Sequence, residues 1–291
     1  MPVTLKGLED IADQFDAYVL DQWGVLHDGA RLYPGVLESL DAMANHGAKS
    51  VVLSNSGKRA ANNRERLTRF GLTERHVGTL ITSGEVLWQT FQSDATGYLG
   101  RHGRRCKLLS RGGDRSPIKG LDLVAVDAPE EADFVLLAGL DDDARIADLT
   151  PLLTRWRSLD LDMVCSNPDN HGVSADGLTV NPGLLAARYA AMGGNVDFYG
   201  KPFQAVYRAV KTVLDGIPVN RVLAIGDSLD HDIVGGQQAG FKTLLVTNGI
   251  HADACRSAAT DEALSQRVAD LAAGHPDRTP DYVMRSLVWS P

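Results

Sequence analysis

Short apolar runs alternate with longer amphipathic segments along most of the chain. Strand-length runs rich in aliphatic and β-branched residues stand at 17–20, 49–53, 196–199, 222–225, 243–246 and 282–284. Helix-length segments lie between them at 35–45, 60–70, 203–214 and 232–239, two of which are followed by Gly71 and Gly240. This alternation is typical of βαβ units, so the pattern predicts an α/β fold with a doubly wound, Rossmann-like parallel sheet.

The middle of the chain interrupts this layout. Residues 83–188 contain strand candidates of their own at 107–109, 134–137 and 162–164. We therefore expect a core built from residues 1–82 and 189–291, with residues 83–188 inserted as a second α/β domain. The alternative is one continuous large sheet, because strand spacing alone does not assign a strand to a sheet.

Polar residues with chemical potential follow several of the predicted core strands. Asp21 ends the first strand, Ser54 and Asn55 follow the second, and Asp227 follows the strand 222–225. The carboxyl ends of parallel strands form the ligand crevice of such a sheet, so residues far apart in sequence can meet there. Together they predict a divalent-cation site with a phosphate-sized ligand.

Each of these residue types suits chemistry at phosphorus. A carboxylate such as Asp21 can attack phosphorus and form an aspartyl phosphate. A serine hydroxyl and backbone amides at a helix start bind phosphate oxygens. Lys201 supplies a positive point charge, and further acids hold Mg²⁺, which prefers oxygen ligands.

The order and wording of these segments resemble the haloacid dehalogenase (HAD) superfamily of aspartate-nucleophile phosphohydrolases. The insertion is similar to a C2-type cap, and its closing stretch, Ser166-Asn167-Pro168-Asp169-Asn170-His171-Gly172, resembles subclass IIA, which includes sugar-phosphate, nucleotide and p-nitrophenyl phosphatases. Four motifs in order carry the resemblance: Asp21-Gln22-Trp23-Gly24-Val25, Leu53-Ser54-Asn55-Ser56, Gly200-Lys201-Pro202 and Gly226-Asp227-Ser228-Leu229-Asp230-His231-Asp232.

The resemblance implies a Mg²⁺-dependent phosphomonoester hydrolase that acts on a small phosphorylated metabolite. Asp21 and Lys201 would be the catalytic residues, with Asp21 as the nucleophile. The motifs also imply that Asp21, Asp227 and the backbone carbonyl of Trp23 bind the metal, and that Asp232 supports the metal's waters. Ser54, Asn55 and Lys201 would bind the phosphate. Asp169, on the cap, would select the substrate.

Trp23 departs from the family pattern. Phosphatases of this family normally carry an acid–base aspartate at that position, and indole can take no such role. Three interpretations follow. The first is a hydrolase that uses another acid, with His27 and Asp28 as candidates, or that acts on substrates with good leaving groups. The second is a phosphotransferase, or an enzyme with a persistent aspartyl phosphate, and the third is a catalytically silent binding protein. His27 as a surface-loop residue and Asp28 as a turn residue are the structural alternatives.

Composition limits the classes of molecule that the protein is expected to bind. The net charge of −8 argues against a general nucleic-acid binder. The chain contains no uninterrupted apolar stretch of about 18 residues, the length of a membrane span. The three cysteines have no ligand-like spacing, so we expect reduced thiols in a cytoplasmic protein. The family resemblance makes a homodimer possible.

Basic residues are concentrated in two places. Lys58, Arg59, Arg64, Arg66 and Arg69 follow the second motif, and a second group lies at 101–115 in the insertion. The first group suits either a solvated helix face or the attraction of anionic substrates. We expect the solvated face.

Overall fold

The computed structural model describes residues 1–93, 102–141, 143–174 and 177–291. Its larger sheet has seven parallel strands in the order β1-β14-β13-β12-β2-β3-β4. This order is doubly wound, because the chain leaves β2 in one direction to β3 and β4 and later returns to its other side at β12. The strands are β1 (Val3–Thr4), β2 (Ala17–Leu20), β3 (Lys49–Ser54), β4 (Thr79–Thr82), β12 (Val222–Gly226), β13 (Lys242–Val246) and β14 (Tyr282–Met284).

Both faces of the larger sheet are buried. In β2, Tyr18 and Leu20 pack on one face while Ala17 and Val19 pack on the other, as the twofold period of a strand requires. The parallel strands therefore read as continuous apolar runs. The helices on this unit are α1 (Val36–Asn45), α2 (Ala60–Arg69), α7 (Gln204–Val213), α8 (Val234–Gln238) and α10 (Asp261–Ala272), with the short α9 (Ala252–Cys255) beside α10.

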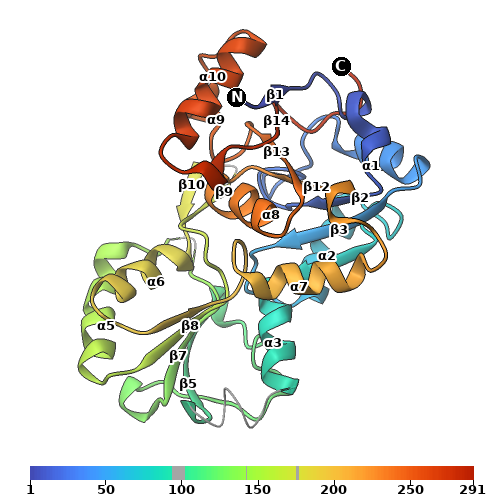
Figure 1. Cartoon of the computed structure of the whole chain (residues 1–291). Helices are drawn as coiled ribbons and strands as arrows, with labels where there is room; N and C mark the ends of the chain where they lie inside the picture. The colour runs from blue at the N-terminus through green and yellow to red at the C-terminus, as the bar shows by residue number, and fades with distance from the viewer. Residues whose placement is uncertain (94–101, 142, 175–176) are drawn as a thin grey trace.

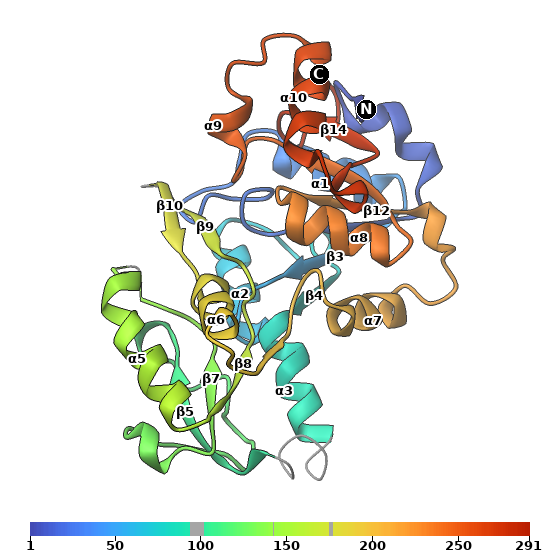
Figure 2. The same ribbon diagram turned by 60° about the vertical axis from the view of Figure 1, so that its left-hand side comes forward.

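A second parallel sheet of five strands lies below the first in Figure 1, in the order β11-β8-β7-β5-β6. Helices α5 and α6 cover one face of it and α3 packs against the other (Figure 2). A β9–β10 hairpin extends towards the first sheet. The elements are α3 (Ser83–Ser93), β5 (Arg105–Leu109), β6 (Val124–Ala125), β7 (Phe134–Leu137), α5 (Ile146–Ser158), β8 (Asp162–Cys165), β9 (His171–Ser174), β10 (Gly177–Val180), α6 (Pro182–Ala191) and β11 (Val196–Phe198).

One alternative and one prediction about sheet membership do not match the structure. The described strands form separate sheets, so the alternative of one continuous sheet fails. The strand expected in the core at 196–199 is β11, which pairs with β8 at the edge of the second sheet. An apolar run predicts a strand but carries no information about its partner. The division of the chain at 83 and 188 stays a prediction, and the pairing of β11 leads us to propose that the second unit extends to Phe198.

Most predicted elements of the first sheet match within one or two residues. The segment expected as one helix at 232–239 instead begins with a π-helical turn, Leu229–Ile233, and continues as α8. Trp156 is fully buried, and all three cysteines are free and buried. Among the described residues, no helix has the length and apolar character needed to cross a membrane.

Candidate active site

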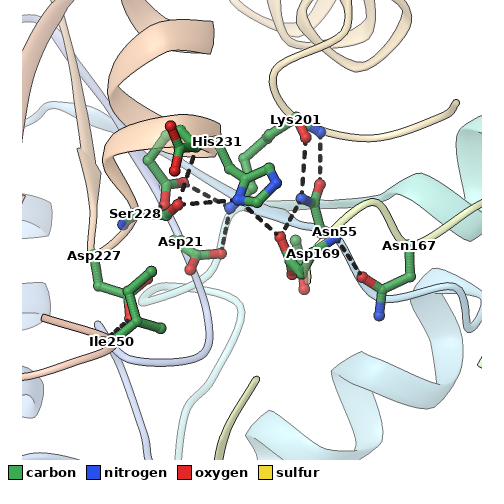
Figure 3. Close-up of polar contacts among 12 residues, drawn as sticks. Asp21, Asn55, Asn167, Asp169, Lys201, Asp227, Ser228, His231 and Ile250 are labelled. Carbon is green, nitrogen blue, oxygen red and sulfur yellow. Dashed lines mark hydrogen bonds and ion pairs between the residues drawn. The ribbon is translucent and has the colours of Figure 1, made fainter. Parts of the chain in front are cut away.

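Three carboxylates meet where β2 and β12 end. These strands are neighbours in the sheet, so Asp21 and Asp227, which follow them, are brought together across two hundred residues of chain (Figure 3). Asp232, in the π-helical turn, completes the group. One oxygen from each of the three carboxylates lies within 4.8 Å of the others.

Lys201 is the counter-charge of this group. Its Nζ donates to Asp21 Oδ1 at 2.6 Å and to Asp232 Oδ1 at 2.7 Å, and its side chain is almost fully buried. Burial opposes the lysine charge, but Asp21 and Asp232 outweigh it and hold the pKa of Lys201 well above its ordinary value. Lys201 is therefore a fixed cation beside Asp21.

The carboxylates are crowded beyond what one lysine neutralises. Burial raises the pKa of Asp21; the Lys201 ammonium opposes the rise and the Asp232 charge adds to it. Burial also raises the pKa of Asp227 well above its usual range, assisted by Asp21 and Asp232. When ionised, three acids against one ammonium carry an excess of negative charge, and their hard oxygen donors suit a divalent cation such as Mg²⁺.

The backbone around Asp227 is shaped to this carboxylate. The amide of Ile250 donates to Asp227 Oδ2 at 2.9 Å. A Cβ at either Gly24 or Gly249 would lie 1.9 Å from the same oxygen, so both positions need glycine. Gly226 also leaves room for Asp232, since a Cβ at position 226 would lie 2.1 Å from the Asp232 side chain.

The predicted phosphate-binding residues line the same pocket. Ser54 and Asn55 are buried at the end of β3. Asn55 Nδ2 donates to Asp169 Oδ1 at 2.7 Å and to the Lys201 carbonyl at 3.2 Å, and Asn55 Oδ1 accepts from the Lys201 amide at 2.6 Å. Both side-chain hydrogens of Asn55 are thus used within the protein.

Asp169 joins the second unit to the first. Besides accepting from Asn55, its Oδ1 lies 3.4 Å from His231 Nδ1. His231 also contacts the Ser228 hydroxyl through Nδ1 at 3.0 Å. A loop of the second unit therefore reaches into the same cluster as the catalytic candidates of the first.

The pocket between the two units has a volume of about 220 Å³. That is below the range of drug-sized ligand sites, so it suits a small molecule. Residues from both units line it: Asp21, Trp23, Ser54, Asn55, Lys58, Arg66, Lys201, Asp227, His231 and Asp232 from the first, and Arg111, Asp169 and His171 from the second.

Trp23 occupies the position of the expected acid. Its ring is half-buried, 4.7 Å from the His27 ring centre, and a Cβ at Gly29 would lie 2.5 Å from it. His27 is fully buried, contrary to the surface alternative, and burial lowers its pKa to about 3. Asp28 accepts hydrogen bonds from the Ala30 and Arg31 amides, as the alternative of a turn residue requires. Neither His27 nor Asp28 lines the pocket.

Known proteins resemble this chain in sequence and fold. A model of haloacid dehalogenase-like hydrolases matches residues 18–123, and a HAD-hydrolase-like model matches residues 198–289. The chain belongs to the HAD superfamily. The comparisons also support subclass IIA, which the sequence motifs predicted.

Individual members of the superfamily support this placement. Rat chronophin is 28% identical over 96% of this chain and 88% of its own length, and a dihydroxyacetone phosphatase of Corynebacterium glutamicum is 25% identical over 82% and 83%. A HAD-like hydrolase from Brucella suis superposes with a TM-score of 0.80 at 26% identity, covering 98% of this chain and all of the other. The chain is a HAD-type phosphatase, a hydrolase of phosphate monoesters, and the binding-protein and phosphotransferase alternatives are not favoured.

The structure brings all eight predicted site residues to one pocket, while their roles stay predictions. Sequence reasoning missed others. His231 lies in the fourth HAD motif but is not among the predicted site residues, and Lys58 and Arg66, expected on a solvated face, also line the pocket. Arg111 stood in a basic stretch of ambiguous meaning, part of which, Arg101, lies outside the described residues.

Proposed function

We propose that the protein is a Mg²⁺-dependent phosphomonoester hydrolase that acts through an aspartyl phosphate on Asp21. The observation that carries the proposal is the contact of Lys201 with both Asp21 and Asp232, next to Asp227. A buried lysine fixed beside an acid cluster has little structural purpose at a pocket wall, because burying charge costs free energy. It has a clear use in orienting a carboxylate towards a phosphoryl group.

The acid cluster supports a resident metal. Asp21, Asp227 and the Trp23 carbonyl would hold Mg²⁺, and Asp232 would hold its waters; the convergence of three buried oxygen donors agrees with this set. When bound, Mg²⁺ would neutralise charge on the phosphoryl oxygens and on the acids. Family members use a divalent metal, and the choice of Mg²⁺ is our proposal.

Different side chains of this chain carry out different parts of the phosphoryl transfer. The Asp21 carboxylate attacks phosphorus, forming the O–P bond while the bond to the leaving oxygen breaks. Lys201 holds the Asp21 carboxylate in place and offsets charge on the phosphoryl group, and Ser54 and the Asn55 amide bind its oxygens. Water then attacks phosphorus and releases inorganic phosphate and Asp21. Residue 23 supplies no proton to the leaving oxygen, so the leaving group departs as an oxyanion and takes its proton from solvent.

The second unit acts as the cap in this proposal. Asp169 closes on Asn55 and His231, which excludes bulk water from the pocket and places cap residues against the leaving group. The small pocket and the small phosphorylated substrate named for the dihydroxyacetone phosphatase relative support a small phosphorylated metabolite as substrate. A cytoplasmic location remains an expectation from the cysteine pattern, and a homodimer remains one from the family resemblance.

Hydrolysis of p-nitrophenyl phosphate tests the proposal, because its leaving group departs with little need for an acid. We expect Mg²⁺-dependent turnover that Asp21→Asn abolishes. Asp13→Asn is the matched control, since the Asp13 side chain is almost fully exposed and lies outside the pocket. Equal turnover in Asp21→Asn, or none in folded wild-type protein with Mg²⁺, would refute the mechanism.

A further inference from the structure

Asn181 stands where helix α6 begins, on the wall that the second unit contributes to the pocket. It is the N-cap residue of α6, a position at which an Asn side chain normally accepts a hydrogen bond from a backbone amide of the first helical turn. The Asn181 side chain makes no such bond, although its backbone is extended as capping requires. A side chain suited to stabilising the helix is therefore not used for that purpose.

The Asn181 side chain is nevertheless buried. The residue is only 9% exposed, and its side-chain amide has no hydrogen-bond partner among residues 1–93, 102–141, 143–174 and 177–291. Burying an amide without a partner costs free energy, because the amide gives up its hydrogen bonds to water. A ligand in the pocket would supply the partner that the described part of the chain does not.

The β9–β10 hairpin holds the amide in place. A Cβ at Gly172 on β9 would lie 2.9 Å from Asn181 Nδ2 and 3.3 Å from its Oδ1, so glycine lets this strand pass close to the amide. The same Cβ would lie 3.1 Å from the Thr179 hydroxyl on β10. Gly172 and Thr179 also line the pocket, so the amide lies where the hairpin borders the ligand space. A group packed in this way has a defined position.

The charged groups on the same wall are engaged within the protein. Arg111 Nε donates to the Leu140 carbonyl at 3.1 Å. Asp169 Oδ1 accepts from Asn55 Nδ2 at 2.7 Å. These contacts join parts of the protein to one another, whereas the uncharged Asn181 amide is available to a ligand.

The direction of the reaction assigns the part of the substrate that meets Asn181. Asp21 attacks from the first unit, and in-line displacement places the leaving oxygen on the opposite side of phosphorus. The second unit forms the other wall of the pocket, so the leaving group extends towards Asn181. The amide there offers two donor hydrogens and one acceptor oxygen without a charge, which suits a hydroxyl or a carbonyl oxygen.

We propose that Asn181 is a specificity-determining residue that hydrogen-bonds an uncharged oxygen of the leaving group. The inference rests on the proposed phosphatase activity, and it gives Asn181 a part in the selection that the sequence motifs assign to Asp169. A hydroxyl and a carbonyl oxygen both accept from Nδ2, and a hydroxyl can also donate to Oδ1. The test therefore treats the two oxygens separately.

Matched substrates test the assignment. 3-Hydroxypropyl phosphate and butyl phosphate differ by a hydroxyl in place of a methyl group, and hydroxyacetone phosphate and isobutyl phosphate differ by a carbonyl oxygen in place of a methyl group. We expect Asn181→Leu, which keeps the size of the side chain, to lower the kcat/KM ratio of at least one pair by about 5- to 30-fold from its wild-type value, the range of a lost hydrogen bond in a buried site. Comparing each ratio between variant and wild type cancels the different reactivities of the leaving groups.

Asn195→Leu is the matched control, because Asn195 belongs to the same unit, is exposed and does not line the pocket. It should keep both wild-type ratios. Unchanged ratios in Asn181→Leu, or equal losses on both members of each pair, would overturn the assignment. Turnover of p-nitrophenyl phosphate by the wild type tests the phosphatase proposal separately.

Urea denaturation separates selection from a role in folding. Because the side chain makes no capping bond, Asn181→Leu and the smaller Asn181→Ala should unfold at the wild-type urea midpoint. A lowered midpoint together with unchanged substrate ratios would show that the side chain serves α6 and would contradict the proposal.

A binding measurement keeps the test independent of turnover. Titration calorimetry compares 4-hydroxybutylphosphonate with pentylphosphonate, and 3-oxobutylphosphonate with 3-methylbutylphosphonate, which are non-hydrolysable analogues of the two pairs. The wild type should bind the oxygen-bearing member of at least one pair more tightly, and Asn181→Ala should lose that difference while Asn195→Leu retains it. Equal affinities within both pairs for the wild type would refute selection by Asn181.

Discussion

At the scale of single residues, Trp23 decides how this site differs from its family's pattern. Indole neither donates an acidic proton at neutral pH nor accepts one, so position 23 cannot serve as the acid–base group. His27 does not replace it, since it is buried outside the pocket and its pKa is lowered to about 3. The wild-type rate should therefore depend on how readily the leaving group departs unassisted.

We expect kcat/KM across a series of aryl and alkyl phosphates to fall steeply as the leaving group's pKa rises. Trp23→Asp should flatten this dependence, with a gain on alkyl phosphates of up to about 10²- to 10⁴-fold, the usual contribution of an acid–base group. Release of inorganic phosphate measures the rates, and circular dichroism checks folding, because losing the packed indole costs about 3 kcal/mol of stability.

Trp23→Phe is the control that keeps an aromatic ring and adds no acid. It should give no gain on alkyl phosphates. An equal gain in both variants would mean that relief of crowding, rather than proton transfer, is responsible.

At the scale of elements, α2 and α3 are tied by one ion pair. Glu85 near the start of α3 accepts from Arg59 Nε at 2.6 Å and Nη2 at 2.9 Å, and from the Ala60 amide at the start of α2 at 3.2 Å. The Arg59 guanidinium also stacks on Trp88, 3.7 Å from the ring centre. The helix that carries Arg66 is thereby anchored to the helix that leads into the second unit.

The Arg59–Glu85 ion pair makes the free energy of unfolding depend on pH in a definite direction. Hydrogen bonds from Arg59 lower the pKa of Glu85 below its ordinary value of 4.5 in the folded state. The unfolded chain then binds more protons in the window below 4.5, so the contribution of Glu85 is complete above about pH 4.5 and is lost as pH falls through the folded-state pKa.

We expect Glu85→Gln to lower the free energy of unfolding by about 1 kcal/mol at pH 7, allowing for partial solvent screening, and by less at pH 4. Urea denaturation at both pH values measures the difference between wild type and variant. Glu65→Gln, on an exposed position of α2, should show no such pH dependence. A difference that grows on acidification would contradict the sign.

At the scale of the whole molecule, polar contacts at the pocket join the two units in the part of the chain that the structure describes. Asp169 reaches from the second unit to Asn55 and His231. Contacts of this kind are polar and local, so relative motion of the two units is the expectation once they are removed.

Asp169→Ala should shift the molecule towards a more open form. We expect a larger radius of gyration in solution scattering and a KM raised about tenfold, because charged hydrogen bonds of this type contribute about 1.5–3 kcal/mol and closure is coupled to substrate binding. Asp148→Ala, an exposed site on α5, is the control. An unchanged radius of gyration with an unchanged KM would show that Asp169 does not hold the units together.

The sequence by itself determined the elements and the identity of the chemical groups. Buried parallel strands require continuous apolar runs, so β2, β7 and β14 were predicted at their observed bounds. Asp21, Ser54, Asn55 and Asp227 were found because they follow such strands, and the ends of parallel strands share one edge of the sheet. Lys201 follows β11 of the second sheet, and its motif rather than its strand identified it.

Tertiary structure decided what depends on partners. The apolar run at 196–199 carried no sign that β11 pairs with β8, since strand pairing is a contact between distant segments. Arg66 read as a solvated helix residue and His27 as a loop residue, because helical spacing does not reveal which face meets a pocket and burial depends on neighbours such as Phe70. Local sequence fixes local conformation and chemistry, whereas burial, pKa and proximity arise only when the chain packs.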